Sequence, residues 1–284
     1  MKIPSLVILI FFGVFVNSSI AQQIDATATT VSTQSIWELL KDDATNALGG
    51  VKHSITQPLR WQGNDFRTLG ILFAGTATLT FADNSVRKFS QNNAADFPKL
   101  LRDFGWYFGS PQNFYMTNAG LYGFGLITKN EKIRKTSVLI FSSSVTTGLL
   151  QTLGKNAIGR ARPSTDQGYL TFSSFANDAG FRSFPSGHTV LSITMAHSIA
   201  KQFDNGWIKA GIYSVGAIAP ISRLIDDAHW LTDIAFSTAL SIIVVDSIDN
   251  YLFNKKDYRD SKKNKYISWN LKFGANQIGV VGSF

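Results

Sequence analysis

The sequence has no cysteine among its 284 residues, which excludes a disulfide framework and any thiolate metal site. Charged residues are also sparse, at 16%, and the acidic kind is the scarcer, with 19 Asp and Glu against 27 Lys and Arg. The resulting net charge of +8 suits anionic partners, such as phosphorylated substrates or an acidic membrane surface. Because the basic residues are dispersed rather than gathered into one stripe, we expect no nucleic-acid partner.

Few apolar runs approach the roughly 20 residues that a bilayer requires, and the amino-terminal run from Ile3 to Val16 is short by that measure. It is followed by small residues, Ser19 and Ala21, that suit a cleavage site. We therefore predict a signal peptide over residues 1–21, with an uncleaved amino-terminal anchor as the alternative. Either one would export the body of the chain to the periplasm or the cell envelope.

The body of the chain carries the pattern of helices. Residues 22–34, rich in Thr, Ser, Gln and Ala, hold too little apolar surface to pack and are predicted to be a disordered leader. Residues 35–255 are predicted to form one all-α domain, a bundle of about six core helices that begins where Ser35 and Glu38 have capping-box spacing. The apolar stretches with few helix breakers are 65–82, 113–127, 131–157, 188–203, 207–221 and 229–250.

Two of these segments, 137–153 and 231–245, are apolar nearly all round, which is typical of either a buried core helix or a membrane span. Their many Ser, Thr and Gly residues and a mean hydropathy near zero favour a soluble or peripheral domain. The tail, 256–284, differs because apolar and polar residues alternate from Tyr266 to Phe273. That alternation predicts a strand, and with the turn at 274–276 a short C-terminal β-hairpin that packs on the bundle, with contact to a membrane as the alternative.

Three separated clusters carry the chemistry, and the first places Lys155 and Arg162 seven residues apart. On a helix that spacing is two turns, so both cations would project from one face, and Pro163 would end the helix. An ammonium group and a guanidinium group at a helix end can clamp a tetrahedral oxyanion. A solvated basic helix end would show the same pattern.

The second cluster is the tetrapeptide from Pro185 to His188, directly before an apolar helical run. Pro185 and Gly187 shape a tight loop, and Ser186 offers a hydroxyl and backbone N–H groups at a helix amino terminus, where a phosphate is favoured. His188 would lie beside that anion. A capping or surface histidine is the alternative interpretation.

The third cluster is Ser222-Arg223, followed by His229 and then Asp233. His229 and Asp233 stand at i and i+4, so on a helix they share a face. The carboxylate could then accept a hydrogen bond from one imidazole nitrogen and leave the other nitrogen as a nucleophile. This is the orienting arrangement of a hydrolase triad applied to a histidine nucleophile.

Together the clusters resemble the signature of the type-2 phosphatidic acid phosphatase and vanadium haloperoxidase superfamily. The resemblance covers residues 155–233 and fits the predicted helical bundle. The positions that match in identity, order and spacing are Lys155, Arg162-Pro163, Pro185 to His188, Ser222-Arg223, His229 and Asp233.

The resemblance implies that His229 attacks phosphorus, that Asp233 orients His229, and that His188 protonates the leaving oxygen. Water would then hydrolyse the phosphohistidine. The groups implied to bind the phosphate oxygens are Lys155, Arg162, Ser186, Gly187 and Arg223. Cations in place of a metal ion imply a metal-independent, acid-phosphatase-like hydrolase without a cofactor. Its substrates would be phosphomonoesters or diphosphates, including lipid phosphates such as phosphatidate or a polyprenyl diphosphate.

Several alternatives stay open at this level. The same pocket could hold vanadate in a haloperoxidase, or bind phosphate without turnover in an envelope protein. Asp226 and Asp227 either face solvent, as is usual for Asp, or point inward and repel a dianionic phosphate. The loop 164–183 is expected to border the pocket. Its aromatic residues would either receive the apolar part of a substrate or pack on the bundle.

Overall fold

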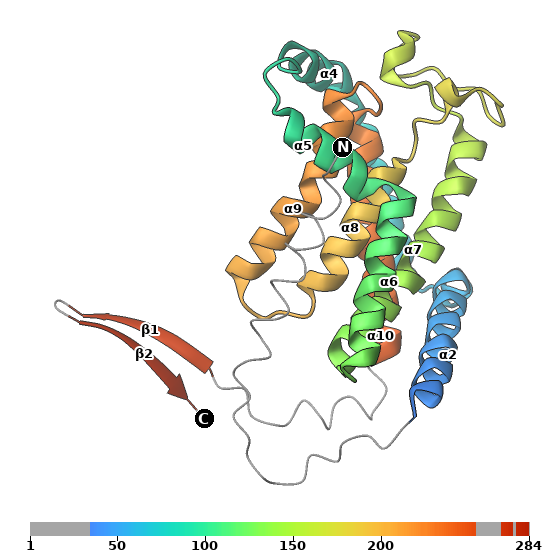
Figure 1. Cartoon of the computed structure of the whole chain (residues 1–284). Helices are drawn as coiled ribbons and strands as arrows, with labels where there is room; N and C mark the ends of the chain where they lie inside the picture. The colour runs from blue at the N-terminus through green and yellow to red at the C-terminus, as the bar shows by residue number, and fades with distance from the viewer. Residues whose placement is uncertain (1–34, 254–267, 275–276, 284) are drawn as a thin grey trace.

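The computed structural model describes residues 35–253, 268–274 and 277–283, and over this part the fold is helical (Figure 1). The predicted signal peptide and leader lie outside the described residues. The α-helices are α2 (Ile36–Ile55), α3 (Gly63–Leu79), α4 (Asp83–Asn92), α5 (Lys99–Gly109), α6 (Pro111–Ile127), α7 (Glu131–Ile158), α8 (Gly187–Ala200), α9 (Gly206–Ile225) and α10 (Leu231–Phe253). Short 3-10 helices lie at Gln57–Arg60, Thr80–Ala82, Pro163–Thr165 and Ala179–Phe181.

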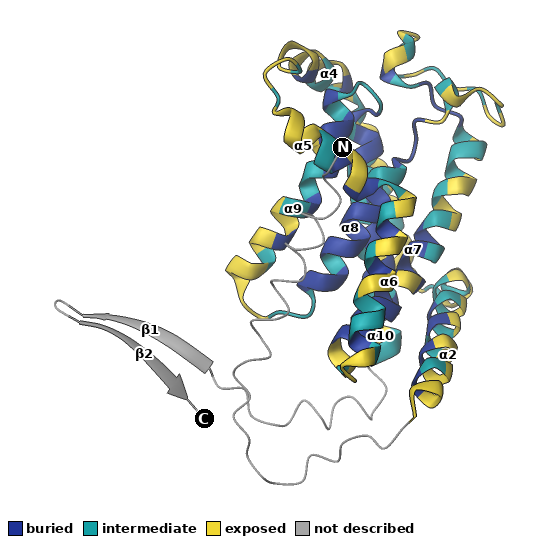
Figure 2. Cartoon of the chain, in the orientation of Figure 1, coloured by how far each residue is buried: buried dark blue, intermediate teal, exposed yellow. Residues whose placement is uncertain are grey.

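Helix α8 is the centre of the bundle, and it packs against α7, α9 and α10. Figure 2 shows it buried along most of its length. One apolar cluster around α8 joins it to α5, α6, α7 and α9 and includes Phe108, Phe114, Ile140, Met195 and Ile199. A second cluster joins α7 to α10. Small hydroxyl residues also join the helices, as where Ser241 on α10 donates to the Val190 carbonyl at 3.1 Å.

The predicted helical segments correspond to helices that begin and end within a few residues of the expected limits, so the all-α class is confirmed. Helices α4 and α5 are different, because no helix was predicted over residues 83–109. Both are short and lie between segments with stronger apolar runs. By length and composition, α9 and α10 are long and apolar enough to cross a membrane.

Two strands follow the helices, β1 (Ser268–Gly274) and β2 (Gln277–Ser283). They pair antiparallel, with Ser268 opposite Ser283 and Gly274 opposite Gln277. Residues 254–267, which connect β1 to α10, lie outside the described residues. The predicted packing of a hairpin on the bundle therefore stays a prediction.

Candidate active site

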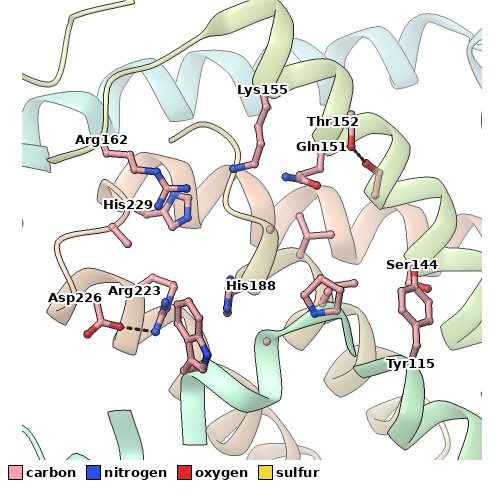
Figure 3. A pocket seen from close by; sticks show the side chains of 18 of the residues that line it. Tyr115, Ser144, Gln151, Thr152, Lys155, Arg162, His188, Arg223, Asp226 and His229 are labelled. Atoms are coloured by element: carbon pink, nitrogen blue, oxygen red, sulfur yellow. Dashed lines mark hydrogen bonds and ion pairs between the residues drawn. The ribbon is translucent and has the colours of Figure 1, made fainter. Parts of the chain in front are cut away.

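A cavity of about 900 Å³ opens at the end of the bundle where α7 and α9 finish and α8 and α10 begin. It brings together residues from all three sequence clusters: Lys155, Arg162, Gly187, His188, Arg223 and His229. In Figure 3 the labelled cations and the two histidines converge on one space from different elements. Asp233 lies behind His229, outside the lining of the cavity.

The first cation pair reaches the cavity by a route that differs from the prediction. Helix α7 ends at Ile158, so Lys155 is helical and Arg162 is not, and Gly159 rather than Pro163 stops the helix. Gly159 adopts left-handed angles, with φ of 59°, and a Cβ there would lie 1.8 Å from the Ser173 carbonyl oxygen. Only glycine fits this turn. The extended segment that follows carries Arg162 back to the cavity beside Lys155.

The second cluster forms the amino terminus of α8, as predicted. Gly187 and His188 line the cavity, whereas Ser186 is fully buried and is not part of the lining. The Ser186 backbone N–H donates to Ser237 Oγ at 2.8 Å, and its hydroxyl accepts from Thr189 at 3.0 Å. The groups of Ser186 that were expected to bind phosphate are thus engaged with the protein. His188 Nε2 is buried and has no hydrogen-bond partner among the described residues.

His229 and Asp233 are close, but they do not share a helical face. Helix α10 begins at Leu231, so His229 lies in the preceding turn and Asp233 lies in the first turn of the helix. His229 Nδ1 is 3.6 Å from Asp233 Oδ2, beyond hydrogen-bond length, and the contact is electrostatic. Since Nδ1 faces the carboxylate, Nε2 is the nitrogen directed away from it.

Asp233 is held from behind by a buried polar network that the sequence analysis did not identify. Arg160 Nη1 donates to Asp233 Oδ1 at 2.7 Å, and Arg160 Nη2 donates to Asp83 Oδ2 at 2.6 Å. Ser183 Oγ and the Trp230 backbone N–H donate to Asp233 Oδ2, at 2.5 and 2.8 Å. Arg160 and both carboxylates are buried, so each charge is paired where water cannot solvate it.

Burial and mutual repulsion set the protonation of the groups in the cavity. Burial, reinforced by Arg162, lowers the pKa of Lys155 to about 8. Burial also lowers the pKa of His229 to about 4, against the opposing effect of Asp233. The pKa of His188 falls to about 3 through burial, with Arg223 as the largest charge effect. Both imidazoles are therefore neutral at pH 7, and His229 has the free lone pair that a nucleophile needs.

Comparison with known proteins matches residues 136–255 to the model of the PAP2 superfamily. The chain is 35% identical over 102 residues to a lipid A 1-phosphatase of Rhizobium etli, a match that covers 34% of this chain and 41% of that protein. Residues 136–255 of this chain are thus similar to the PAP2 superfamily. The chain is also 28% identical over 195 residues to a probable diacylglycerol pyrophosphate phosphatase 1 of Schizosaccharomyces pombe, covering 57% of this chain and 70% of that protein.

The chain thus spans less than half the length of the lipid A 1-phosphatases that it matches. Among solved structures, it is similar to the crystal structure of Aquifex aeolicus LpxE, with a TM-score of 0.44 and 22% identity over 60% of this chain and 95% of that chain. The matched region of the PAP2 superfamily begins in α7 and includes every cluster described above.

Part of the cavity wall comes from outside the matched PAP2 region. Helix α5 contributes Arg102, Trp106 and Gly109, and α6 contributes Pro111 and Tyr115. With Val145, Leu149, Val190 and Leu191 from α7 and α8, these residues give the cavity an apolar side. The loop 164–183 contributes Ser164 only, so its aromatic residues do not line the cavity. One of them, Tyr169, packs edge-on against Trp230, as the packing alternative expected.

Asp226 and Asp227 are both engaged in ion pairs rather than facing solvent, and each side chain is 18% exposed. Asp226 lines the cavity and pairs with Arg102 and Arg223. Asp227 pairs with Arg87, which donates at 2.7 and 2.8 Å, and it is not part of the lining. Asp226 is thus the inward-pointing carboxylate, and two cations offset its charge. Among the described residues no group of His, Asp and Glu is arranged to hold a metal ion.

Proposed function

We propose that this protein is an exported, metal-independent phosphatase that hydrolyses phosphomonoesters or diphosphates of lipids through a phosphohistidine on His229. The observation that carries the proposal is the convergence of two neutral histidines with Lys155, Arg162 and Arg223 on one cavity that has an apolar side. The relatives named above support a lipid phosphate, because their names state lipid A and diacylglycerol pyrophosphate. Export is supported by the amino-terminal pattern of residues 1–21 alone.

In the proposed mechanism, Lys155, Arg162 and Arg223 bind the phosphoryl oxygens, with the Gly187 N–H at the start of α8. These positive groups neutralise the charge that phosphoryl transfer spreads over the equatorial oxygens, which is the main catalytic demand of the reaction. His229 Nε2 forms a bond to phosphorus while the bond to the leaving oxygen breaks. The Asp233 carboxylate stabilises the positive charge that develops on the imidazole.

His188 is proposed to protonate the leaving oxygen and then to activate the water that hydrolyses the phosphohistidine. With a pKa of about 3 in the free protein, His188 carries no proton at neutral pH. Part of that depression comes from Arg223, Lys155 and Arg162, and a bound phosphate would neutralise these three charges. Substrate binding is therefore expected to raise the pKa of His188. His188 can then carry the proton that the leaving group needs.

The test is phosphate release from p-nitrophenyl phosphate, a phosphatidate and a polyprenyl diphosphate, with chelator present. Wild type should release phosphate from at least one lipid substrate, and His229→Ala should release none. His197→Ala is the matched control, because His197 lies toward the other end of α8 and bonds Tyr213 and Asp246. Loss of activity on chelation would contradict the metal-independent mechanism. Turnover by His229→Ala would contradict a phosphohistidine intermediate on His229.

A further inference from the structure

Helix α5 lies outside the matched PAP2 region, yet its backbone is pressed against two active-site residues. A Cβ on Gly109 would lie 2.7 Å from the Cβ of His188. A Cβ on Gly105, one turn earlier, would lie 2.4 Å from Ser222 Oγ, the hydroxyl that accepts from Arg223 Nε at 3.3 Å. Two glycines one turn apart thus allow α5 to approach α8 and α9 more closely than any other residue would permit.

On the cavity side of α5, a single aromatic ring contacts both of these neighbours. The centroid of the Trp106 ring is 5.1 Å from the centroid of the His188 ring, with 39° between the planes. The Arg223 guanidinium carbon is 4.8 Å from the centroid of the Trp106 ring, within the range of a cation–π contact. Trp106 therefore touches the proposed proton donor and one of the proposed phosphate-binding cations together.

The orientation of His188 depends on this packing. Its buried Nε2 has no hydrogen-bond partner among the described residues, so no fixed polar group on that nitrogen sets the angle of the ring. What limits rotation of the imidazole is Trp106 on one side and the α5 backbone at Gly109. A proton donor needs this constraint, because a small misplacement of the donor atom costs much of its catalytic effect.

We propose that Trp106 is a positioning residue for the leaving-group half of the reaction, holding the His188 imidazole in its catalytic orientation. The proposal rests on the function proposed above. It differs from a merely structural role in one respect. Loss of Trp106 should impair substrates according to how much their leaving group needs a proton.

The kinetic test uses a series of aryl phosphates and an alkyl phosphate, with Trp106→Leu and Trp106→Phe. Because general acid catalysis contributes roughly 10²–10⁴-fold, Trp106→Leu should lower kcat/KM by about 10–10²-fold on the alkyl phosphate and by less than about threefold on dinitrophenyl phosphate. Trp106→Phe keeps a ring and should recover most of the loss. Trp207→Leu, at a residue 88% exposed at the start of α9, is the control for tryptophan removal as such.

The same series on the His188→Ala background completes the test. If Trp106 acts through His188, adding Trp106→Leu to His188→Ala should lower kcat/KM on the alkyl phosphate by less than about twofold, because the proton donor is already absent. An equal loss on every substrate, or a fully multiplicative loss in the double variant, would overturn the proposal.

A readout without turnover separates this proposal from the proposed function. The imidazole NMR signals of His188, identified by their loss in His188→Ala, should shift in Trp106→Leu and largely return in Trp106→Phe, while those of His229 stay in place. An unchanged His188 signal in Trp106→Leu would contradict the positioning role even if the wild type hydrolysed none of the substrates. If the NMR signals shift as expected but the wild type releases no phosphate, the result would contradict the proposed phosphatase function and not the positioning role of Trp106.

Discussion

The two histidines of the cavity are held in place by different means. Behind His229 lies a chain of buried charges, in which Arg160 donates hydrogen bonds to both Asp233 and Asp83. Beside His188 lie an aromatic ring and a helix backbone, and its own buried Nε2 has no hydrogen-bond partner within the described part of the chain. The nucleophile side is thus fixed by electrostatics and the acid side by shape.

This difference fits the work proposed for each ring. A nucleophile must present the same nitrogen in every cycle, and a carboxylate that is itself fully bonded keeps its partner in one orientation. A residue that gives up a proton and takes it back must change charge, and a permanent carboxylate partner would hold the proton in place. Apolar and π contacts orient His188 without fixing its protonation state. The charge of the bound phosphate then determines whether His188 carries a proton.

The largest effect is expected where the charged chain behind His229 is cut. Arg160→Met would leave Asp83 and Asp233 buried without their cation, which typically costs about 3–5 kcal/mol. It should also lower kcat by about 10²-fold, because Asp233 would no longer be held against His229. Urea unfolding and kinetics on the same preparations measure both effects.

The matched control is Arg134→Met, which breaks another buried ion pair, that of Arg134 with Asp43 at 2.5 Å. Arg134 lies 21 residues before Lys155 on α7, roughly 30 Å away along the helix axis. Its loss should destabilise the fold to a similar extent and leave kcat unchanged in the folded protein. Equal kinetics in the two variants would mean that the network behind Asp233 is only structural.

The largest effect on turnover without loss of stability is expected for His188→Ala, which should separate the two halves of the reaction. With p-nitrophenyl phosphate the leaving group needs little protonation, so His229 should still be phosphorylated. Hydrolysis of the phosphohistidine should then slow by roughly 10²–10⁴-fold, because the base that activates water is missing. Phosphoprotein should accumulate on rapid acid quench and be absent in His229→Ala. Failure to accumulate would mean that another group activates the water.

Sequence patterns predicted the residues of the cavity better than the geometry that brings them together. Lys155, Arg162, His188, Arg223 and His229 do meet in one cavity. The assumed helical spacing was wrong twice, because Gly159 ends α7 early and α10 begins only at Leu231. Tertiary folding brings the side chains together where helical periodicity alone would not have done so.

The residues that support the two histidines were much harder to predict. Trp106 and Gly109 belong to a helix of only 11 residues, and no spacing rule connects them to His188. Asp83 and Arg160 were missed for a related reason, since their role depends on a contact between residues 77 positions apart. The one available signal was Arg160 itself, a third cation within the run from Lys155 to Arg162.

The phosphate-binding cations can be tested by pH, with a smaller expected effect. Since the pKa of Lys155 is lowered to about 8, its charge is lost as the pH rises through that value. The kcat/KM profile reports the free enzyme, so it should fall above pH 8 and be roughly tenfold down at pH 9. Lys155→Arg keeps its charge at these pH values, and the alkaline decline should disappear. A decline unchanged in Lys155→Arg would assign that ionisation to another group.

The smallest effect is expected at Asp226, where the two sides of the cavity meet. Its carboxylate forms ion pairs with Arg223 and Arg102 and so competes with phosphate for the same cations. Asp226→Asn should therefore tighten inhibition by inorganic phosphate about three- to fivefold, or roughly 1 kcal/mol. Asp227→Asn is the control, because Asp227 lies outside the cavity lining and Asn tolerates its φ of 53°.

The direction of the change at Asp226 decides between two physical roles. Tighter phosphate binding would mean that the carboxylate lowers the positive potential of the cavity, so that product is released more readily. Weaker binding would mean that Arg223 depends on Asp226 for its position, as His229 depends on Asp233. In that case electrostatic support would extend to Arg223 on the acid side as well. Support by packing alone would then be limited to the contact between Trp106 and His188.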